Sequence, residues 1–225
     1  MTRTHTTLYS ASEYDEKIHA TLPFYDSFHR QTIDLVRSLP KSPEKWLDIG
    51  CGTGNLYLCA EKCFPDTEFI LADPSEEMLA IARGKIAADK SPLFLLSDSQ
   101  SLTFPDNSFD VISAIQSHHY SDQAERKKAV ENSFRMLRPG GVFIVFENIR
   151  PRSEKALPVA QRRLENYQIR RGRTRNDARQ HIDRFDREYF PITIPEHLSL
   201  LDEIGFSVVE ILWASYLQAG FYAMK

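Results

Sequence analysis

Short apolar runs alternate with longer amphipathic segments between residues 45 and 148. A short apolar run bounded by turn residues predicts a buried strand, and apolar positions three or four apart predict a helix. On this basis we expect strands at 45–49, 68–72, 92–96, 109–115 and 142–147. Helices are predicted at 56–63, 75–87 and 124–137, the last of them ended by Pro139-Gly140-Gly141. This alternation favours parallel βαβ units, and therefore a doubly wound α/β fold with helices on both faces of the sheet.

The C-terminal part departs from this alternation. Two β-rich runs, 206–213 and 216–224, are separated by a very short turn. Parallel neighbours need a crossover of about a dozen residues or more, so these runs must pair in an antiparallel manner. We therefore expect a seven-stranded, mostly parallel sheet with an antiparallel C-terminal hairpin at its edge. A helix at 195–204, ended by Gly205, is predicted before the hairpin.

Two further segments lie outside the strand and helix alternation. Residues 9–39 are predicted to form two helices, which gives a helical N-terminal cap over residues 1–40. Residues 150–188 follow the fifth strand and predict a helical lid insertion over residues 150–190. This insertion holds twelve Lys and Arg against six Asp and Glu, so it is locally basic in a chain of formal net charge −3. At 225 residues we expect a single domain, 1–225.

Composition narrows the class of protein. Apolar residues make up 42% of the chain, which is enough for a sizeable core. The cysteines, Cys51, Cys59 and Cys63, form no even disulfide framework; we interpret the last two as small buried thiols and expect no metal site. The chain starts without an apolar signal segment and contains no apolar run of membrane length. We expect a soluble cytoplasmic protein, monomeric or homodimeric.

A glycine-rich run lies where the first predicted strand passes into the first helix: Asp48-Ile49-Gly50-Cys51-Gly52-Thr53-Gly54. Glycine allows a tight turn and close approach of a ligand, and the helix N-terminus behind it offers free N–H groups. Dinucleotide enzymes use the spacing G-x-G-x-x-G to hold a pyrophosphate. Here the spacing is G-x-G-x-G, and the preceding Asp48 would repel a pyrophosphate but could pair with an ammonium group. The run favours a ligand that carries an amino acid, and it argues against a nicotinamide dehydrogenase.

Acidic residues also follow the next two strands. Asp73, about twenty residues after the glycine run, ends the second strand and could accept both hydroxyls of a ribose. Asp98 follows the third strand and could accept a hydrogen bond from the amine of a base. The ends of parallel strands meet at the sheet edge where open α/β sheets bind ligands. Each acid taken alone could instead cap a helix or a loop.

Together these motifs resemble those of class I S-adenosylmethionine (SAM)-dependent methyltransferases. Residues 47–56 resemble the glycine-rich motif of the family, and Asp73 resembles its ribose-binding acid. The stretch 104–110 resembles the lead-in to the fourth strand, and 137–141 resembles the turn before the fifth. The resemblance implies a Rossmann-like fold, SAM as cofactor and S-adenosylhomocysteine (SAH) as product.

The resemblance also implies which residues contact the cofactor. The methionine portion is expected to contact the glycine-rich run and the residue after it, namely Asp48, Gly50, Cys51, Gly52, Gly54 and Asn55. The ribose and adenine are expected to contact residues that follow the second and third strands: Asp73, Pro74, Met78, Asp98 and Ser99. Gln116, just past the fourth strand, is expected near the sulfonium.

The N-terminal segment carries a weaker resemblance. Tyr14-Asp15-Glu16-Lys17 and Leu22-Pro23-Phe24-Tyr25-Asp26 are similar to the cap helix of some small-molecule methyltransferases. They are also similar to the start of carboxy-SAM synthases, which share the fold but remodel the cofactor. Tyr14 and Tyr25 could close over the cofactor, or they could simply pack an amphipathic helix.

The catalytic candidates are His118 and His119, directly after the fourth strand in Gln116-Ser117-His118-His119-Tyr120. Methyl transfer from a sulfonium is an in-line displacement whose leaving group departs neutral, so the protein mainly aligns the reactants and excludes water. A base is needed only for a protonated acceptor, and an imidazole with a pKa of about 6.5 can act as one. His119 is the preferred candidate, although either histidine could instead cap or pack against the next helix.

The basic insertion is expected to contact the methyl acceptor because it leaves the sheet at the same edge. Its arginines, densest at 170–175, could clamp an anionic small molecule, contact RNA or form a solvated helix face. Sparse aromatic interleaving and an acidic chain make nucleic acid the weaker alternative. The sequence therefore predicts a SAM-dependent methyltransferase with a small-molecule acceptor. A carboxy-SAM synthase, a tRNA-modifying relative and a non-catalytic SAM-binding regulatory protein remain alternatives.

Overall fold

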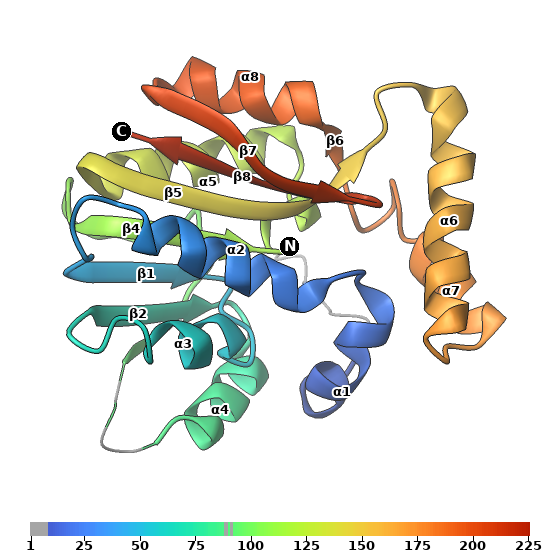
Figure 1. Ribbon diagram of the computed structural model, residues 1–225, viewed down its shortest axis with the longest axis horizontal. Helices are drawn as coiled ribbons and strands as arrows, with labels where there is room; N and C mark the ends of the chain where they lie inside the picture. The colour runs from blue at the N-terminus through green and yellow to red at the C-terminus, as the bar shows by residue number, and fades with distance from the viewer. Residues whose placement is uncertain (1–8, 88–89, 91) are drawn as a thin grey trace.

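A mixed sheet forms the centre of the computed structural model, which describes residues 9–87, 90 and 92–225 (Figure 1). Within these residues the sheet has eight strands, seven of them in the order β3-β2-β1-β4-β5-β8-β7 and the short β6 paired with β5. The strands are β1 (Lys45–Ile49), β2 (Glu68–Asp73), β3 (Leu93–Leu96), β4 (Phe109–Ile115), β5 (Leu137–Arg150), β6 (Ile192–Thr193), β7 (Val208–Ser215) and β8 (Gln218–Met224). Neighbours among β1 to β5 pair in parallel, which confirms the predicted doubly wound α/β fold.

Helices cover both faces of the sheet. The helices α2 (Tyr25–Arg37), α3 (Asn55–Ala60) and α4 (Glu76–Lys85) contribute to the core cluster on one face. The helices α5 (Gln123–Met136) and α8 (Ile194–Ile204) contribute to the cluster on the other face. Because successive strand side chains point to opposite faces, β1 supplies Trp46 to the first cluster and Leu47 to the second. Burial on both faces explains why the strands read as continuous apolar runs.

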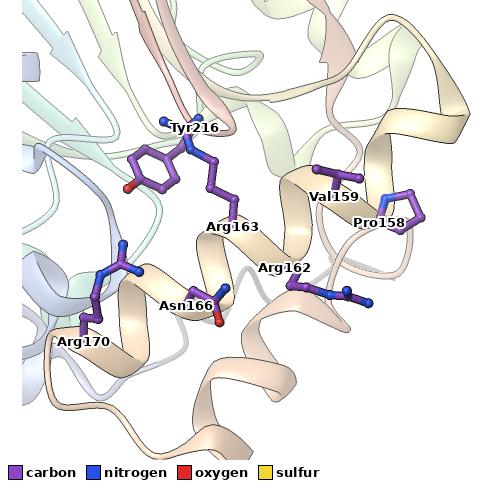
Figure 2. A pocket seen from close by; sticks show the side chains of 7 residues that line it. All are labelled: Pro158, Val159, Arg162, Arg163, Asn166, Arg170 and Tyr216. Carbon is purple, nitrogen blue, oxygen red and sulfur yellow. The ribbon is translucent and has the colours of Figure 1, made fainter.

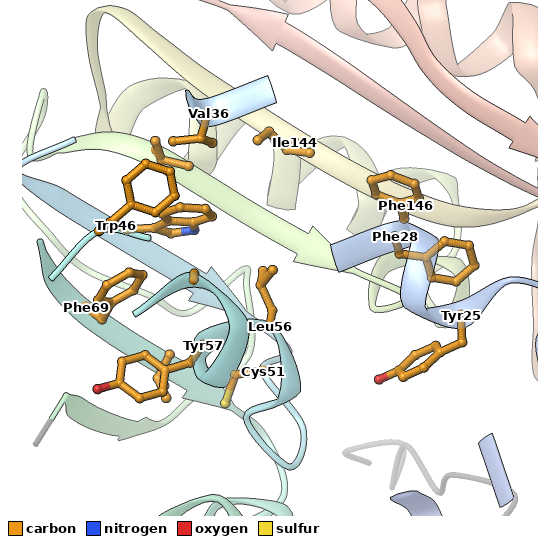
Figure 3. Packing of buried hydrophobic residues seen from close by; sticks show 14 of the residues in the cluster. Tyr25, Phe28, Val36, Trp46, Cys51, Leu56, Tyr57, Phe69, Ile144 and Phe146 are labelled. Atoms are coloured by element: carbon orange, nitrogen blue, oxygen red, sulfur yellow. The ribbon is translucent and has the colours of Figure 1, made fainter. Parts of the chain in front are cut away.

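Aromatic rings dominate the first cluster (Figure 3). Trp46 stacks on Phe69 with ring centroids 5.5 Å apart, and Phe28 of α2 lies 5.1 Å from Phe146 of β5. Phe28 and Phe146 are fully buried, and each side chain of this size contributes roughly 1.5–3 kcal/mol of burial free energy. This packing fixes α2 against the sheet.

The C-terminal hairpin completes the sheet beyond β5. The strand β8 pairs in antiparallel fashion with both β5 and β7, and Tyr216 and Leu217 form the turn between β7 and β8. This turn lies at the same end of the sheet as the C-terminal ends of β1 and β4 (Figure 1). The predicted hairpin is confirmed, and so is the helix before it, which ends at Gly205 with a φ of 106°.

The first N-terminal helix, α1 (Ala11–Thr21), and the insertion lie beside each other at this end of the sheet (Figure 1). The helix α1 precedes α2, and the insertion forms η2 (Glu154–Ala156), α6 (Leu157–Arg170) and α7 (Arg175–Ile182). The Tyr167 hydroxyl donates to the His19 carbonyl at 3.2 Å, and Gln168 Nε2 donates to the Thr21 carbonyl at 3.0 Å. Both predicted helical segments are confirmed, while residues 1–8 of the predicted cap lie outside the described residues.

The role expected of Pro139-Gly140-Gly141 is wrong. The helix α5 ends at Met136 and the chain enters β5 at once, so the three residues lie inside this strand. The register with β4 shifts at this point, and a Cβ on Gly141 would lie 2.9 Å from the Arg138 carbonyl oxygen and 3.0 Å from that of Asp110. Glycine is needed here for a close approach of two strands, not to stop a helix.

The burial expected of two cysteines is also wrong. Cys59 and Cys63 are exposed, because the helix α3 turns Leu56, Tyr57 and Ala60 toward the core and leaves the opposite side to solvent. Cys51, in the glycine-rich run, is buried. No helix in the described part of the chain is long and apolar enough to cross a membrane.

Candidate functional site

The glycine-rich run forms the loop from β1 into α3, and its three glycines have left-handed φ angles of 66°, 55° and 79°. The backbone N–H groups of Gly50 and Cys51 donate to the Ala72 carbonyl at 2.7 and 3.0 Å, which ties the loop to the end of β2. A Cβ on Gly50 would lie only 2.6 Å from Cβ of Ser117, just after β4. The ends of three strands therefore meet around this loop. A Cβ on Gly52 would meet no heavy atom of the described residues within 4 Å, so a ligand has room to approach the backbone there.

Asp73 connects the end of β2 to this loop. Its Oδ2 accepts from the Gly52 N–H and its Oδ1 from the Ser75 N–H, both at 2.8 Å. The residue is 7% exposed, and burial raises the pKa of its carboxyl against the lowering effect of these two hydrogen bonds. Each carboxylate oxygen can accept more than one hydrogen bond, so Asp73 keeps acceptor capacity for a ribose.

Asp48 lies in β1 directly beneath the loop and is buried. The Ser113 hydroxyl donates to its Oδ1 at 2.6 Å, and Trp46 Nε1 donates in turn to that hydroxyl at 2.9 Å. Burial raises the pKa of Asp48 to about 7, the Ser113 hydrogen bond lowers it, and the nearby Asp73 raises it further. An acid in this state would gain from a cationic partner, as expected for the ammonium of an amino-acid ligand.

A polar network that the sequence did not reveal connects the cap to the loop. Asp15 of α1 accepts on Oδ1 from the Thr53 hydroxyl at 2.6 Å and from Asn55 Nδ2 at 2.8 Å. Lys85, at the end of α4, donates to Asp15 Oδ2 at 2.7 Å and to Asn55 Oδ1 at 2.6 Å. Burial opposes ionisation of Asp15, but the hydrogen bonds from Lys85, Thr53 and Asn55 outweigh it and lower its pKa. The amide of Asn55, expected to contact the cofactor, is thus held by Asp15 and Lys85.

The two tyrosines of the cap lie together beside this network. Asn55 Nδ2 also lies 3.4 Å from the Tyr25 hydroxyl, and burial raises the pKa of Tyr25 to about 12. Burial, with Tyr25 and Tyr120 nearby, holds the pKa of Tyr14 well above its usual value. Tyr25 belongs to the core cluster and Tyr14 packs against it. Packing of the cap and closure over the loop are therefore compatible.

Of the residues expected to contact the adenine, some lie at the start of α4 and Asp98 lies in the turn after β3. Pro74 leads into α4, where the Ser75 hydroxyl accepts from the Met78 N–H at 3.3 Å and the Met78 side chain is buried. Asp98 is exposed, and its Oδ1 accepts from the N–H groups of Gln100 and Ser101 at 3.0 and 2.8 Å. Asp98 thus closes the turn after β3, which is the loop role left open by the sequence.

Gln116 and Ser117 follow β4, and Ser117 lies against Gly50 of the glycine loop. Gln116 has a left-handed φ of 57°, and its N–H donates to the Phe146 carbonyl at 2.7 Å. Both Gln116 Nε2 and Ser117 Oγ are buried without a hydrogen-bond partner among residues 9–87, 90 and 92–225. Buried polar atoms are normally satisfied, so unpaired ones beside an open glycine loop indicate a place for a polar ligand.

The two histidines share one carboxylate. Glu147 of β5 accepts on Oε1 from the backbone N–H of His118 at 2.9 Å, and its Oε2 lies 3.0 Å from the ring nitrogen Nδ1 of His119. Burial raises the pKa of Glu147, but the hydrogen bond and charge of His119, with His118 nearby, lower it overall. The carboxylate is therefore ionised and holds the proton of His119 on Nδ1, which leaves Nε2 as the basic nitrogen. Glu147 is a site residue that the sequence did not reveal, because only strand pairing brings it to His119.

The rings of the two histidines lie in different surroundings. The ring of His118 stacks on Phe143 in a small internal hollow lined also by Arg126 and His197. Both ring nitrogens are buried without a hydrogen-bond partner in the described part of the chain. Burial lowers the pKa of His118. The ring of His119 instead lies 4.3 Å from that of Tyr120 and 5.1 Å from that of Tyr189, toward the insertion. His118 is thus placed in the core and His119 between sheet and insertion.

Comparison with known proteins agrees with this geometry. A family model described as a methyltransferase domain matches residues 47–141. The demethylmenaquinone methyltransferase of Thermus thermophilus is 36% identical over 121 residues, and this match spans about half of either chain, 53%. The carboxy-SAM synthase of Campylobacter concisus is 29% identical over 219 residues, which cover 96% of this chain and 92% of that one.

Residues 47–141 of the chain, which include the glycine-rich loop, are thus similar to a methyltransferase domain. The solved plantazolicin methyltransferase BpumL, in complex with a pentazolic analog and SAH, has the same fold, with a TM-score of 0.70 at 17% identity over 96% of this chain and 89% of that one. SAM is the cofactor that the sequence predicts, and the match to a methyltransferase domain agrees with this prediction. The residues present fit it, since the open space at Gly52 and the unpaired atoms of Gln116 and Ser117 lie at the strand ends.

Proposed function

We propose that this methyltransferase transfers the methyl group of SAM to a small-molecule acceptor. The observation that carries the proposal is the link between cap and loop: Asp15 of α1 is hydrogen-bonded to Thr53 and Asn55, so the cap covers the cofactor loop. The insertion is joined to the same cap through Tyr167 and Gln168. An enclosed site favours a small acceptor and excludes water from a reactive sulfonium.

Each part of the cofactor has a matching group in this proposal. Asp48 faces the ammonium beneath the backbone of Gly50, Cys51, Gly52 and Gly54, and Gln116 lies near the sulfonium. Asp73 accepts from the ribose hydroxyls, and Met78 packs on the adenine ring next to Pro74, Asp98 and Ser99. Tyr14 and Tyr25 close the site from above, with Asn55 as the contact between loop and cap. Residues 1–225 act as one SAM-binding domain, with residues 1–40 as cap and 150–190 as lid.

The chemistry that the chain supplies is alignment and, for a protonated acceptor, a base. SAM when bound supplies the methyl group and leaves as neutral SAH, so the displacement needs no acid. His119 accepts the acceptor's proton on Nε2, because Glu147 holds its other nitrogen in the protonated form. Glu147 is a positioning residue in this scheme, and His118 packs behind it in the core.

A second candidate is a carboxy-SAM synthase. It is favoured by one observation, the match to the Campylobacter concisus enzyme over nearly the whole length of both chains, whereas the match to the Thermus thermophilus methyltransferase spans about half. The two candidates differ in the fate of the cofactor, because a synthase modifies SAM and a methyltransferase converts it to SAH.

The test is direct. Mass spectrometry of the purified protein should find SAM or SAH, and a screen of small acceptors should find one that releases SAH in the presence of the protein. Recovery of carboxy-SAM would assign the protein to the synthases instead. Binding of SAM without SAH release from any acceptor would leave a SAM-binding regulatory protein.

A further inference from the structure

A hollow of about 400 Å³ lies between α6 and the turn of the β7–β8 hairpin (Figure 2). It is lined by side chains of one face of α6 and by the aromatic residue of the turn, namely Pro158, Val159, Arg162, Arg163, Asn166, Arg170 and Tyr216. We call it the arginine groove. Positions 159, 163, 166 and 170 are spaced by three or four residues, so one face of the helix presents them together. The volume matches that of small-molecule pockets.

The charge of this groove is not neutralised within the described residues. Arg162, Arg163 and Arg170 are exposed, and none has a carboxylate within ion-pair distance there. Other arginines of the insertion are paired, for example Arg150 with Glu154. The guanidinium of Arg163 instead lies 3.8 Å from the centre of the Tyr216 ring. Three guanidinium groups around one hollow favour an anion, because each can donate two parallel hydrogen bonds to a carboxylate or phosphate.

Tyr216, the aromatic residue of the groove, has a strained backbone conformation. Tyr216 has a φ of 54°, in a turn position that favours Gly or Asn, and Phe24 of the cap has a φ of 59°. Their rings lie 6.2 Å apart, and Phe24 is 53% exposed. Residues with a strained backbone conformation persist at binding sites more than elsewhere. Here the Tyr216 ring forms an aromatic wall beside the arginines, and the Phe24 ring lies behind it at an angle of 53°.

The groove lies next to the proposed site of methyl transfer. Tyr216 packs against a core cluster that contains Leu164, Tyr189 and Leu217. The Tyr189 ring lies 5.1 Å from the ring of His119 on the other side of this cluster. The buried side chains of this cluster therefore connect the wall of the groove with the candidate base.

We propose that the arginine groove binds the anionic end of the acceptor, a carboxylate or phosphate joined to a planar apolar body. The anion is bound by the lining guanidinium groups of Arg162 and Arg170, and the flat part packs against Tyr216 beside the Arg163 guanidinium. As an acceptor subsite this rests on the proposed methyl transfer, but the binding itself does not. The hollow is of small-molecule size and sits on a chain of net charge −3, which favours a small anion over a nucleic acid.

Binding is tested with probes of matched shape. The full-length protein, saturated with SAH, is titrated with 2-naphthoate, 2-naphthyl phosphate and neutral 2-naphthamide and followed by amide NMR. At least one anion should shift the signals of residues 158–170 and 216, and the tighter one identifies the anionic group. The neutral amide should bind about tenfold more weakly or worse, because it loses charge-assisted hydrogen bonds. Equal binding of the amide, or no shift with either anion at millimolar concentration, would overturn the proposal.

Variants locate the site. The double variant Arg162→Gln/Arg170→Gln should lose about tenfold or more in affinity for the anion. Arg175→Gln, an exposed arginine on α7 outside the groove, should bind as the wild type does. Equal loss in both would mean general attraction to positive charge, and displacement of the anion from the groove by an RNA oligonucleotide of unrelated sequence would assign the patch to nucleic acid. Either result refutes an acceptor subsite.

Different results would refute the groove as acceptor subsite and the proposed methyl transfer. With an anionic acceptor found by SAH release, the double variant should raise KM and leave kcat and SAM affinity unchanged. Unchanged KM would refute the groove as acceptor subsite and leave methyl transfer intact. Tight anion binding without SAH release from any acceptor would retain the groove and refute the proposed function.

Discussion

At the scale of single residues, Asp73 has two tasks that compete for one carboxylate. Its oxygens fix the backbone of Gly52 and Ser75, and the same carboxylate is proposed to receive the ribose hydroxyls. Asp73→Ala should therefore weaken SAM binding by about tenfold or more, since a hydrogen bond to a charged group is worth about 1.5–3 kcal/mol. Calorimetry measures this, with Asp66→Ala in an exposed loop as control. Unchanged SAM affinity would mean that the ribose lies elsewhere.

Asp48 predicts a pH dependence of SAM binding. Burial raises its pKa to about 7 in the free protein, and an ammonium partner stabilises only its ionised form. SAM affinity should thus fall as the pH drops below 7, by at most about tenfold per pH unit, and Asp48→Asn should abolish this dependence. Since the folded state binds the Asp48 proton more tightly, the contribution of Asp48 to stability without ligand should decrease as pH rises from about 4 to 7, opposite in sign to that of the buried histidines. Calorimetric titration with SAM across this pH range measures the dependence. If the affinity of Asp48→Asn changes with pH as steeply as that of the wild type, Asp48 does not pair with the ammonium group.

The pair of His119 and Glu147 predicts unequal losses of turnover. Because a positioned base contributes about 10²–10⁴-fold, His119→Ala should reduce kcat by that order. Glu147→Gln should reduce it less, since the imidazole remains but loses its charged partner. SAH release with the identified acceptor measures both, while SAM affinity serves as the control. Near-wild-type turnover of His119→Ala between about pH 6 and 9 would remove it as the base.

At the scale of elements, the contact between α1 and the glycine loop joins segments that are distant in the chain. Asp15 is hydrogen-bonded to Thr53, Asn55 and Lys85, and its side chain is 40% exposed. A half-exposed pair of this kind contributes about 1 kcal/mol or less to global stability. Its main effect should be local, because it holds the cap in place over the loop.

Asp15→Ala is therefore expected to loosen the cap without unfolding the domain. Hydrogen exchange should increase in residues 11–21, and SAM should dissociate faster, while the free energy of unfolding changes by about 1 kcal/mol or less. Glu16→Ala, at the next and exposed position, is the matched control. Exchange in α1 that matches the wild type would show that other contacts hold the cap.

At the scale of the whole molecule, buried neutral histidines connect the layers. Burial lowers the pKa of His29 and His197 to about 4 and that of His181 to about 3. His181 Nδ1 lies 2.6 Å from Gln168 Nε2, which also donates to the Thr21 carbonyl of the cap. Protonation of His181 would break this contact between insertion and cap, so neutral histidines are part of the native packing.

The structure consequently predicts loss of stability in mild acid. The unfolded chain takes up protons on these histidines below about pH 6.5, and the folded chain does so only near pH 4 or lower. As the pH is lowered through this range, the free energy of unfolding should therefore decrease by up to about 1.4 kcal/mol per pH unit for each histidine. His197→Phe keeps the ring that stacks on Phe221 and should make this slope shallower. Urea unfolding between about pH 4 and 8 measures the slope, and an unchanged slope in the variant would contradict the prediction.

The core of the fold is predictable because its signals are local. The strands at 45–49 and 109–115 have the predicted bounds, since each is a continuous apolar run closed by turn residues. The hairpin follows from a connection too short for parallel pairing. Pro139-Gly140-Gly141 was misplaced because the same residues can stop a helix or accommodate a close approach of strands, and only the pairing with β4 distinguishes them.

What the sequence determined by itself is the cofactor edge of the molecule: three strand ends, a glycine loop and the acids that follow, all set by short segments with their own spacing. Only the tertiary structure decided which partners these groups meet. Asp15 reaches Lys85 across 70 positions of the chain, and Glu147 reaches His119 across 28. Arg163 meets Tyr216 only because the insertion packs against the hairpin. Such contacts leave no local pattern, because their energy depends on how distant elements pack and not on the spacing of neighbouring residues.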